Sequence, residues 1–105
     1  MSIDIEWIRK HITNGEYLYR LHAAERASER NIDPLDVKEA LINGDIIEQY
    51  PEDPRGKSCL VCGKTALGRI LHILCGCSED ILWIITVYEP DPIIWSNDRK
   101  RRYSP

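Results

Sequence analysis

The sequence predicts an α+β domain in which N-terminal helices pack on one face of a mainly antiparallel sheet of about four strands. Residues 2–43 contain amphipathic segments with recognisable helix caps. Residues 46–88 contain runs of β-branched and aromatic residues separated by turn residues. Helices followed by a meander of strands are typical of this class. The chain has 105 residues, so we expect one domain that spans residues 1–105.

The sheet is predicted to centre on residues 69–91, which hold two long apolar runs. Their Ile, Leu, Val, Trp, Tyr and Thr residues suit a pleated, half-buried surface. The polar segment Ser78-Glu79-Asp80 separates the two runs and has the length of a hairpin loop. We therefore expect an antiparallel hairpin with a three-residue loop.

This loop length also predicts which side chains share a face. Successive side chains of a strand point to opposite sides. One wholly apolar side is then expected to hold Leu71, Ile73, Cys75, Cys77, Ile81, Trp83, Ile85 and Val87. The other side would carry His72 opposite Thr86, with Tyr88 nearby. A shift of one residue would exchange the two sides, so the assignment depends on the loop.

The helices are predicted from their caps. Ser2 can begin a first helix that ends at Asn14-Gly15, and residues 16–21 alternate enough for a short strand or an extended connector. A third helix begins with Asp33 as N-cap and Pro34 in its first turn. Asn43-Gly44 is expected to end it in a left-handed conformation.

The second helix, over residues 22–31, places His22, Arg26 and Arg30 at intervals of four residues. This spacing puts the three side chains on one face. A cationic row of this kind could bind phosphate. Glu25 and Glu29 flank the row, however, and a solvent-facing helix laced with ion pairs is the alternative.

Charge and hydropathy limit the classes of function. The net charge of −3 argues against nonspecific nucleic-acid binding through bulk charge. A basic cluster at residues 99–102 is either a solvated tail or a phosphate contact. No apolar run approaches the roughly 20 residues of a membrane helix. The N-terminus lacks the layout of a signal peptide, so we expect a cytoplasmic protein without membrane contact.

The four cysteines have the composition of a zinc site. The expected register places Cys59 and Cys75 on one side of the sheet and Cys62 on the other, so the ligands would not converge. Free cysteine in a buried strand behaves as a small hydrophobe. We expect no metal and no other cofactor. The weaker alternative is a zinc site formed by Cys59, Cys62, Cys75 and Cys77.

Several motifs agree in order and spacing with one family. They are His22-Ala23-x-x-Arg26-x-x-x-Arg30-x-Ile32, Val37 to Ala40, Gly44, Ile47-Glu48-x-Tyr50-Pro51, Cys59-Leu60, Gly68-Arg69-x-Leu71-His72 and Ile85-Thr86-Val87-Tyr88-x-Pro90-Asp91-x-x-x-Trp95. Over about residues 17–102 the chain resembles the bacterial domain-of-unknown-function family 4258. The resemblance implies a small RelE-like domain, related to the RelE/ParE and BrnT toxins and sometimes encoded beside zinc-ribbon antitoxin-like proteins. The family has no established activity, and Cys62 and Cys77 look like local variation.

The toxin resemblance leads to a chemical hypothesis. RNA cleavage by attack of a 2′-hydroxyl needs an acid, a base and cations on the phosphate. His22 and His72 are the candidate acid and base, and Tyr88 could orient or protonate the leaving oxygen. The candidate phosphate or RNA contacts are Arg26, Arg30, Thr86, Trp95, Arg99 and Arg102. The protein would be a toxin, a candidate metal-independent endoribonuclease, with RNA and a cognate antitoxin as partners.

The competing hypothesis is a protein-binding module without catalysis. His22, Arg26, His72 and Tyr88 would then form a structural hydrogen-bonded network, and the basic surface would bind an acidic partner. One feature separates the two hypotheses. A nuclease needs at least one imidazole exposed in a cleft near guanidinium groups, whereas a structural network buries both rings.

Overall fold

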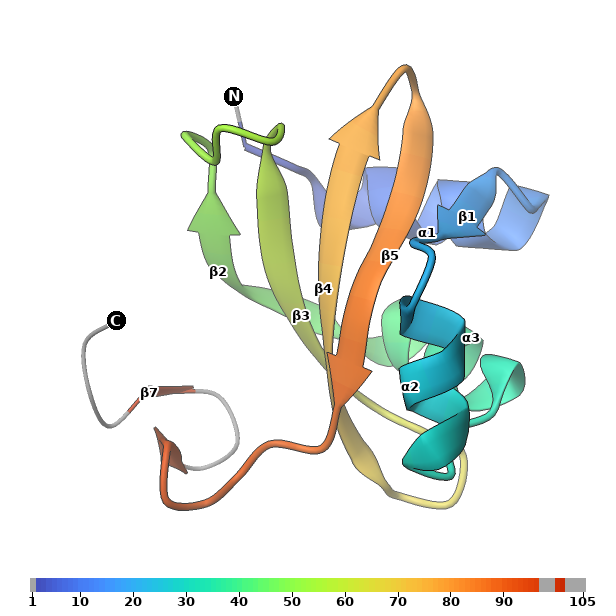
Figure 1. Ribbon diagram of the computed structural model, residues 1–105, viewed down its shortest axis with the longest axis vertical. Helices are drawn as coiled ribbons and strands as arrows, with labels where there is room; N and C mark the ends of the chain where they lie inside the picture. Colours follow the sequence, from blue (N-terminus) through green and yellow to red (C-terminus); the bar gives the residue numbers. More distant parts are fainter. Residues whose placement is uncertain (1, 97–99, 102–105) are drawn as a thin grey trace.

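A computed structural model of the chain describes residues 2–96 and 100–101. The fold is α+β, as predicted (Figure 1). The helices of this part of the chain are α1 (Ile5–Asn14), α2 (Ala23–Glu29) and α3 (Pro34–Asn43). The main sheet contains β1 (Tyr17–Tyr19), β2 (Asp45–Tyr50), β3 (Ser58–Lys64), β4 (Ile70–Ser78) and β5 (Ile81–Tyr88). A small second sheet pairs β6 (Trp95–Ser96) with β7 (Lys100–Arg101).

The main sheet has the order β1-β5-β4-β3-β2. Its strands are antiparallel except β1, which pairs with β5 in parallel and brings the sheet to five strands instead of about four. The additional strand is the segment for which the sequence left open a strand or a connector. None of the described helices is both long and apolar enough to cross a membrane.

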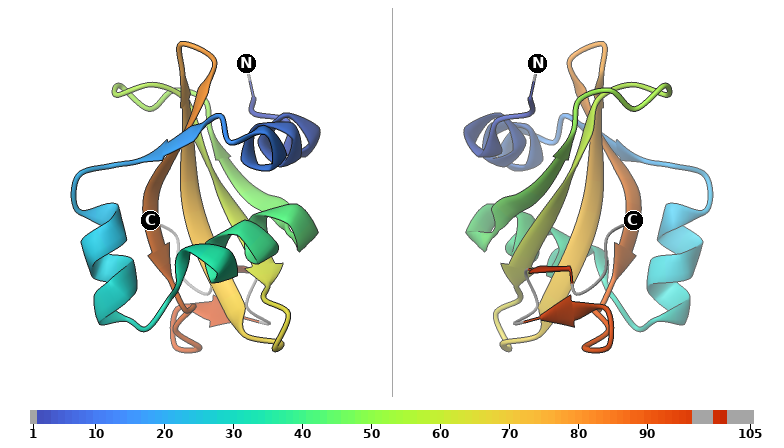
Figure 2. Two further views of the ribbon diagram at one scale, coloured as in Figure 1. Left: turned by 90° about the vertical axis from the view of Figure 1, so that its right-hand side faces the viewer. Right: turned by 90° about the vertical axis from the view of Figure 1, so that its left-hand side faces the viewer.

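The helices divide the sheet into a covered face and an open face. Helices α1 and α3 lie together on one face, whereas α2 lies beside β5 near the edge of the sheet (Figure 2). The core fills the space under α1 and α3. Its fully buried side chains include Ile8, Ile12, Val37, Leu41, Val61, Leu71, Ile73, Leu82, Ile84 and Val87. On the opposite face, Trp95 packs against His72, and Trp83 and Ile85 line a hollow.

Helix α3 approaches β3 at backbone distance, and two glycines allow this approach. A Cβ atom at Gly63 would lie 1.9 Å from the carbonyl oxygen of Ala40. A Cβ atom at Gly44, directly after α3, would lie 2.8 Å from the carbonyl oxygen of Cys62 in β3. Gly44 has φ −92° and ψ 174°, so the prediction of a left-handed end to α3 was wrong. Close packing, and not left-handed backbone, is the reason for glycine at this position.

The β4–β5 hairpin has a two-residue turn, so the predicted register was wrong. Glu79 and Asp80 have φ values of 53° and 58°, and Ser78 pairs directly with Ile81. Two left-handed residues in a row give a turn whose twist matches that of a hairpin. The register therefore moves by one residue, and Trp83 pairs with Gly76 instead of Cys75.

A bulge in β5 then moves the pairing by a second residue, which returns Val87 to the same side of the sheet as Ile73. The register shifts between Leu74 and Cys75, because Leu74 pairs with Thr86 and Cys75 pairs with Ile84. Ile85 is the extra residue of the bulge. The covered face receives Leu82, Ile84 and Val87, which are buried. Trp83 and Ile85, both expected on the wholly apolar side with Ile73, are half-buried and line hollows on the open face.

Helix α1 is bound to the turn of this hairpin. The indole Nε1 of Trp7 donates a hydrogen bond to Asp80 Oδ1 at 3.1 Å, and His11 Nε2 lies 3.1 Å from the same oxygen. The rings of Trp7 and His11 stack with centroids 3.9 Å apart. The hydrogen bond from Trp7, followed by the contact with His11, holds the pKa of the Asp80 carboxyl below its usual value of 3.8.

The Ala40 contact predicts a large difference between two buried strand glycines. Gly63→Ala should lower the free energy of unfolding by about 3 kcal/mol, because helix backbone would have to move. Gly76→Ala is the matched control, since its new methyl group would meet the flexible end of Ile85 at 3.1 Å. That variant should lose less than about 1.5 kcal/mol. Urea unfolding measures both, and equal losses would contradict the close packing of α3.

The Asp80 contact predicts a pH dependence of stability. A carboxyl whose pKa is lowered by folding stabilises the protein above its unfolded value, here 3.8, and loses this contribution as pH falls through the folded pKa. The difference in unfolding free energy between wild type and Asp80→Asn should therefore shrink below pH 3.8. Trp7→Phe, which removes the indole donor, should weaken the same dependence. A difference that stays constant on acidification would contradict the contact.

Candidate functional site

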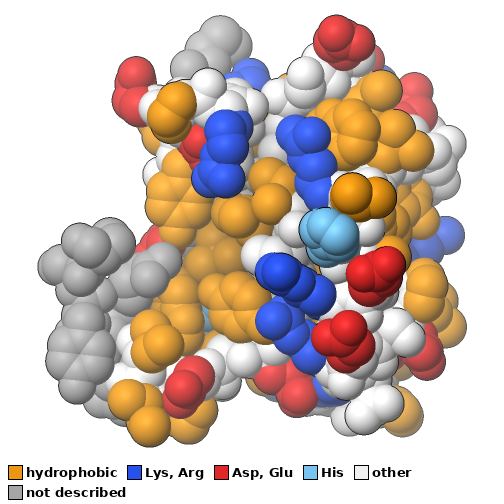
Figure 3. All heavy atoms as spheres, viewed as in Figure 1, with side chains coloured by type: hydrophobic (Ala, Val, Ile, Leu, Met, Phe, Trp, Pro, Cys, Tyr) orange, Lys and Arg blue, Asp and Glu red, His pale blue; other side chains and the backbone are white. Residues whose placement is uncertain are grey.

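A groove crosses the open face of the sheet, and it consists of three connected hollows. The central hollow has a volume of about 480 Å³. It shares Arg20 and Ile85 with a hollow of about 300 Å³ beside α2, and Asp53 and Arg55 with another of about 300 Å³ beside β2. Figure 3 shows this face, where an apolar surface is bordered by Lys and Arg side chains. We call these three hollows the open-face groove.

His22 lies at the α2 end of the groove. Ala23 and Ala27 are buried and hold α2 against the sheet, so the side chains of His22 and Arg26 remain outside. His22 is 64% exposed, and its Nδ1 lies 3.5 Å from Glu25 Oε2. His22, Arg26 and Arg20 line the same hollow. The structure thus brings together two of the sequence-predicted residues and adds Arg20.

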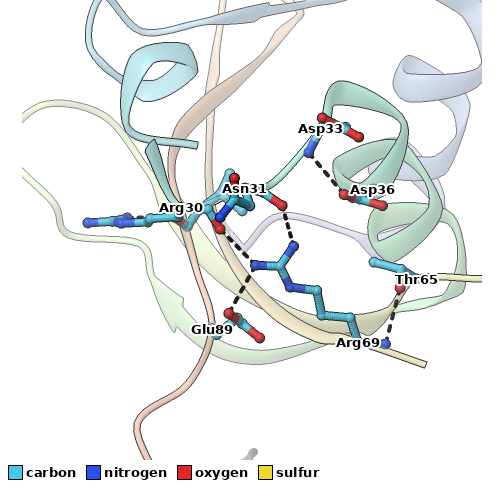
Figure 4. A network of polar contacts seen from close by, with 8 residues as sticks. Arg30, Asn31, Asp33, Asp36, Thr65, Arg69 and Glu89 are labelled. Carbon is cyan, nitrogen blue, oxygen red and sulfur yellow. Dashed lines mark hydrogen bonds and ion pairs between the residues drawn. The ribbon is translucent and has the colours of Figure 1, made fainter. Parts of the chain in front are cut away.

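Arg30 is in a different position from Arg26. Its guanidinium Nη1 donates a hydrogen bond to the carbonyl oxygen of Val87 at 2.6 Å. In Figure 4 the side chain of Arg30 extends away from the network around Arg69 and across towards β5. Arg30 therefore joins the end of α2 to the end of β5, which is a structural role.

Arg69 reinforces this junction. Its guanidinium donates to the carbonyl oxygens of Arg30 and Asn31 and to Glu89 Oε1, the last at 2.9 Å (Figure 4). The hydrogen bond and opposite charge of Arg69 lower the pKa of Glu89, and those of Glu89 raise the pKa of Arg69. The two pKa changes have opposite directions, and both favour the charged form of the group, as expected of an ion pair.

His72 is fully buried, in contrast to His22. Its Nδ1 lies 3.2 Å from the hydroxyl oxygen of Tyr88. The ring of Trp95 meets the His72 ring edge to face, with centroids 4.5 Å apart. Trp95 is only 3% exposed, so its ring is not available for stacking with a base. The structure does not place His72 in the hollow that holds His22.

The remaining predicted residues are divided between the groove and the end of the chain. Thr86 and Tyr88 are half-buried and line the hollow beside β2. Arg99 and Arg102 lie outside the described residues. The C-terminal RNA contacts therefore stay a prediction.

The cysteines do not converge. Cys59 pairs directly with Cys75 on the covered face, whereas Cys62 pairs with His72, two residues away from the expected register. Burial raises the pKa of the Cys59 thiol to about 12 and that of Cys75 well above its usual value. Protonated thiols are poor metal ligands. Across residues 2–96 and 100–101, no group of three or more potential His, Cys, Asp or Glu ligands could hold a metal ion.

The groove also contains residues that the sequence analysis missed. The Arg20 guanidinium carbon lies 4.5 Å from the centre of the Trp83 ring. Arg55 and Lys57 border the same hollow from the β2–β3 connection. The length of the β4–β5 turn is the sequence feature that could have identified Trp83 as an open-face residue. A two-residue loop at Glu79-Asp80 moves Trp83 from the covered face to the open face.

Residues 19–89 match the family described as "Domain of unknown function (DUF4258)". The match covers more than half of the chain and extends from the end of β1 to the residue after β5. The chain belongs to the DUF4258 family. No curated protein and no solved structure gives a significant match to it. His22, Arg20 and Trp83 all lie within the DUF4258 match, whereas α1 and Trp95 lie outside it.

The environments of the two histidines predict effects of very different size on stability. His72→Ala should lower the free energy of unfolding by about 2–4 kcal/mol, because it leaves a cavity and removes a buried hydrogen-bond partner of Tyr88. His22→Ala removes an exposed ring and should change it by less than about 0.5 kcal/mol. Urea unfolding followed by circular dichroism measures both. Equal effects would contradict the difference in burial.

Proposed function

We propose that this DUF4258 domain is the toxin component of a toxin–antitoxin pair and cleaves RNA without a metal ion. The observation that supports this best is the hollow beside α2, where the exposed imidazole of His22 lies with the guanidinium groups of Arg20 and Arg26. This arrangement meets the requirement for a nuclease, an exposed proton-transfer group next to cations. Arg20 replaces Arg30 in the cationic pair that the sequence predicted.

The proposed reaction uses the 2′-hydroxyl of the RNA as nucleophile. Its oxygen attacks the adjacent phosphorus while its proton passes to His22, and Glu25 stabilises the imidazolium that forms. The bond from phosphorus to the 5′ oxygen breaks, and this oxygen takes a proton from water. The hydroxide that remains takes the proton of the imidazolium, which returns His22 to its neutral form. The products are a 2′,3′-cyclic phosphate and a 5′-hydroxyl end. Arg20 and Arg26 neutralise the charge that develops on the phosphoryl oxygens.

The second candidate function is a protein-binding module without catalysis. The contacts of His72, Arg30 and Arg69 favour it, because these three side chains bind other parts of the fold. The open-face groove would then receive an acidic segment of a partner protein. A cognate antitoxin is the partner that we propose for the toxin. Growth and cleavage measurements separate the two candidates.

The toxin proposal predicts the behaviour of two groove variants. Induced wild type should arrest growth, and purified protein should cleave RNA in the presence of EDTA. His22→Ala should reduce cleavage by about 10²- to 10⁴-fold through loss of proton transfer. Arg26→Ala should reduce it by about 10²- to 10³-fold through loss of charge stabilisation.

The control for charge is Lys38→Ala. Lys38 is exposed on α3, which covers the other face of the sheet, so its removal changes the net charge without touching the groove. This variant should cleave RNA and arrest growth like wild type. Full toxicity of folded His22→Ala would contradict the role of His22. Harmlessness of every variant, wild type included, would favour the protein-binding module.

A further inference from the structure

We propose that the centre of the open-face groove is a subsite for one unpaired base of a single-stranded RNA. In this subsite Trp83 is the stacking surface and Arg20 binds a neighbouring phosphate. The inference rests on the proposed function for the identity of the ligand as RNA. It extends that function in two respects: the RNA is single-stranded at this subsite, and Trp83 and Arg20, which the sequence analysis did not identify, bind it.

The environment of Trp83 leaves space for a flat ligand. Trp83 projects from β5 opposite Gly76 of β4, which carries no side chain. A Cβ atom at Gly76 would lie 3.7 Å from Trp83 Cβ and 3.1 Å from Ile85 Cδ1. Because Gly76 has no Cβ, this space beside the two side chains stays part of the hollow. The indole is half-buried and borders the largest of the three hollows. A large aromatic side chain is thus presented at the surface and not in the core.

Arg20 gives this surface its preference for a nucleotide. Its exposed guanidinium lies over the Trp83 ring at 4.5 Å from the centre. Nucleic-acid bases stack on indole rings and on guanidinium planes. A base can therefore replace Arg20 on the indole or stack on the guanidinium, and in either case the cation stays beside the phosphate. A base within a duplex is already stacked and paired on both sides, so the subsite favours single strands.

The charges around the central hollow favour a polyanion. Arg20, Arg55 and Lys57 line it together with a single carboxylate, that of Asp53. Asp53 accepts hydrogen bonds from the backbone N–H of Arg55 at 3.0 Å and from the hydroxyl of Ser58 at 3.3 Å, and it also pairs with the Arg55 guanidinium, whose Nε lies 3.4 Å from Oδ1. Its charge is thus already compensated by the loop that carries it. The local excess of positive charge contrasts with the net charge of −3 for the whole chain.

The order of the residues along the groove indicates a path for the strand. The hollow with His22 and Arg26 adjoins the hollow with Trp83, and Arg20 lines both. Arg55 and Lys57 border the far side of the central hollow. A strand that places its scissile phosphate near His22 can stack the neighbouring base on Trp83 and continue over the β2–β3 connection. An acidic peptide would use the same cations but would have no need of the indole.

The test is direct binding of short fluorescein-labelled 2′-O-methyl RNA, which lacks the nucleophilic hydroxyl and cannot be cleaved by the proposed reaction. The wild type should bind a single-stranded 12-nucleotide probe at least about tenfold more tightly than the matched duplex. Trp83→Ala should weaken binding about 5- to 100-fold, the usual effect of losing one base stack. Trp83→Phe keeps an aromatic ring and should stay within about threefold of wild type.

Two further measurements separate stacking from charge and from misfolding. Arg55→Ala should reduce the slope of log affinity against log salt by about 0.7 and keep the preference for single strands. Addition of probe should quench tryptophan fluorescence in wild type and not in Trp83→Phe. The other two tryptophans should not respond, because Trp95 is buried and Trp7 belongs to α1 on the covered face. This readout needs only the conservative variant and does not depend on the folding of Trp83→Ala.

The outcomes distinguish this inference from the proposed function. Trp83-dependent binding of single strands without RNA cleavage or growth arrest would support the subsite and contradict the toxin proposal. Cleavage with equal probe affinity in wild type and folded Trp83→Ala would overturn the subsite and leave the toxin proposal intact. Equal affinity for single strand and duplex, or no binding of either probe at low salt, would also overturn the subsite.

Discussion

The register between β4 and β5 is the constraint on which the arrangement of this domain depends. Two consecutive left-handed residues, Glu79 and Asp80, determine the turn, and the bulge at Ile85 determines how the pairing continues. Together they send alternate side chains of β5 to the core and to the open face. The same turn receives α1 through Trp7 and His11. One short segment therefore controls the composition of the core, the position of α1 and the availability of Trp83.

The cationic side chains near α2 divide into two groups with different roles. Arg30 and Arg69 donate hydrogen bonds to backbone carbonyl oxygens and hold the end of α2 against β5 and the α2–α3 connection. Arg20 and Arg26 line a hollow beside His22. Guanidinium groups that bind carbonyl oxygens are committed to the fold, whereas those in a hollow can bind a ligand. The proposed function rests on the second group.

The two histidines of the family motifs also separate. His72 is fully buried beside Tyr88 and Trp95, and His22 is exposed between Arg20 and Glu25. Burial of His72 agrees with the structural hypothesis for that residue, and exposure of His22 agrees with the catalytic hypothesis for the other. The two histidines therefore do not belong to one network: His72 lies in a buried contact with Tyr88, and His22 lines the hollow beside α2.

The sequence by itself determined the α+β class, the N-cap of α3, the helical face shared by His22 and Arg26, and the separation of Cys59 from Cys62. These features follow from local periodicity and capping, which are encoded within a few residues. Only the tertiary structure decided the exposure of Trp83, the burial of His72 under Trp95 and the different roles of Arg26 and Arg30. Each of these depends on a contact between distant segments. The position of Trp83 also depends on a one-residue difference in turn length, which the alternation of apolar residues alone does not resolve.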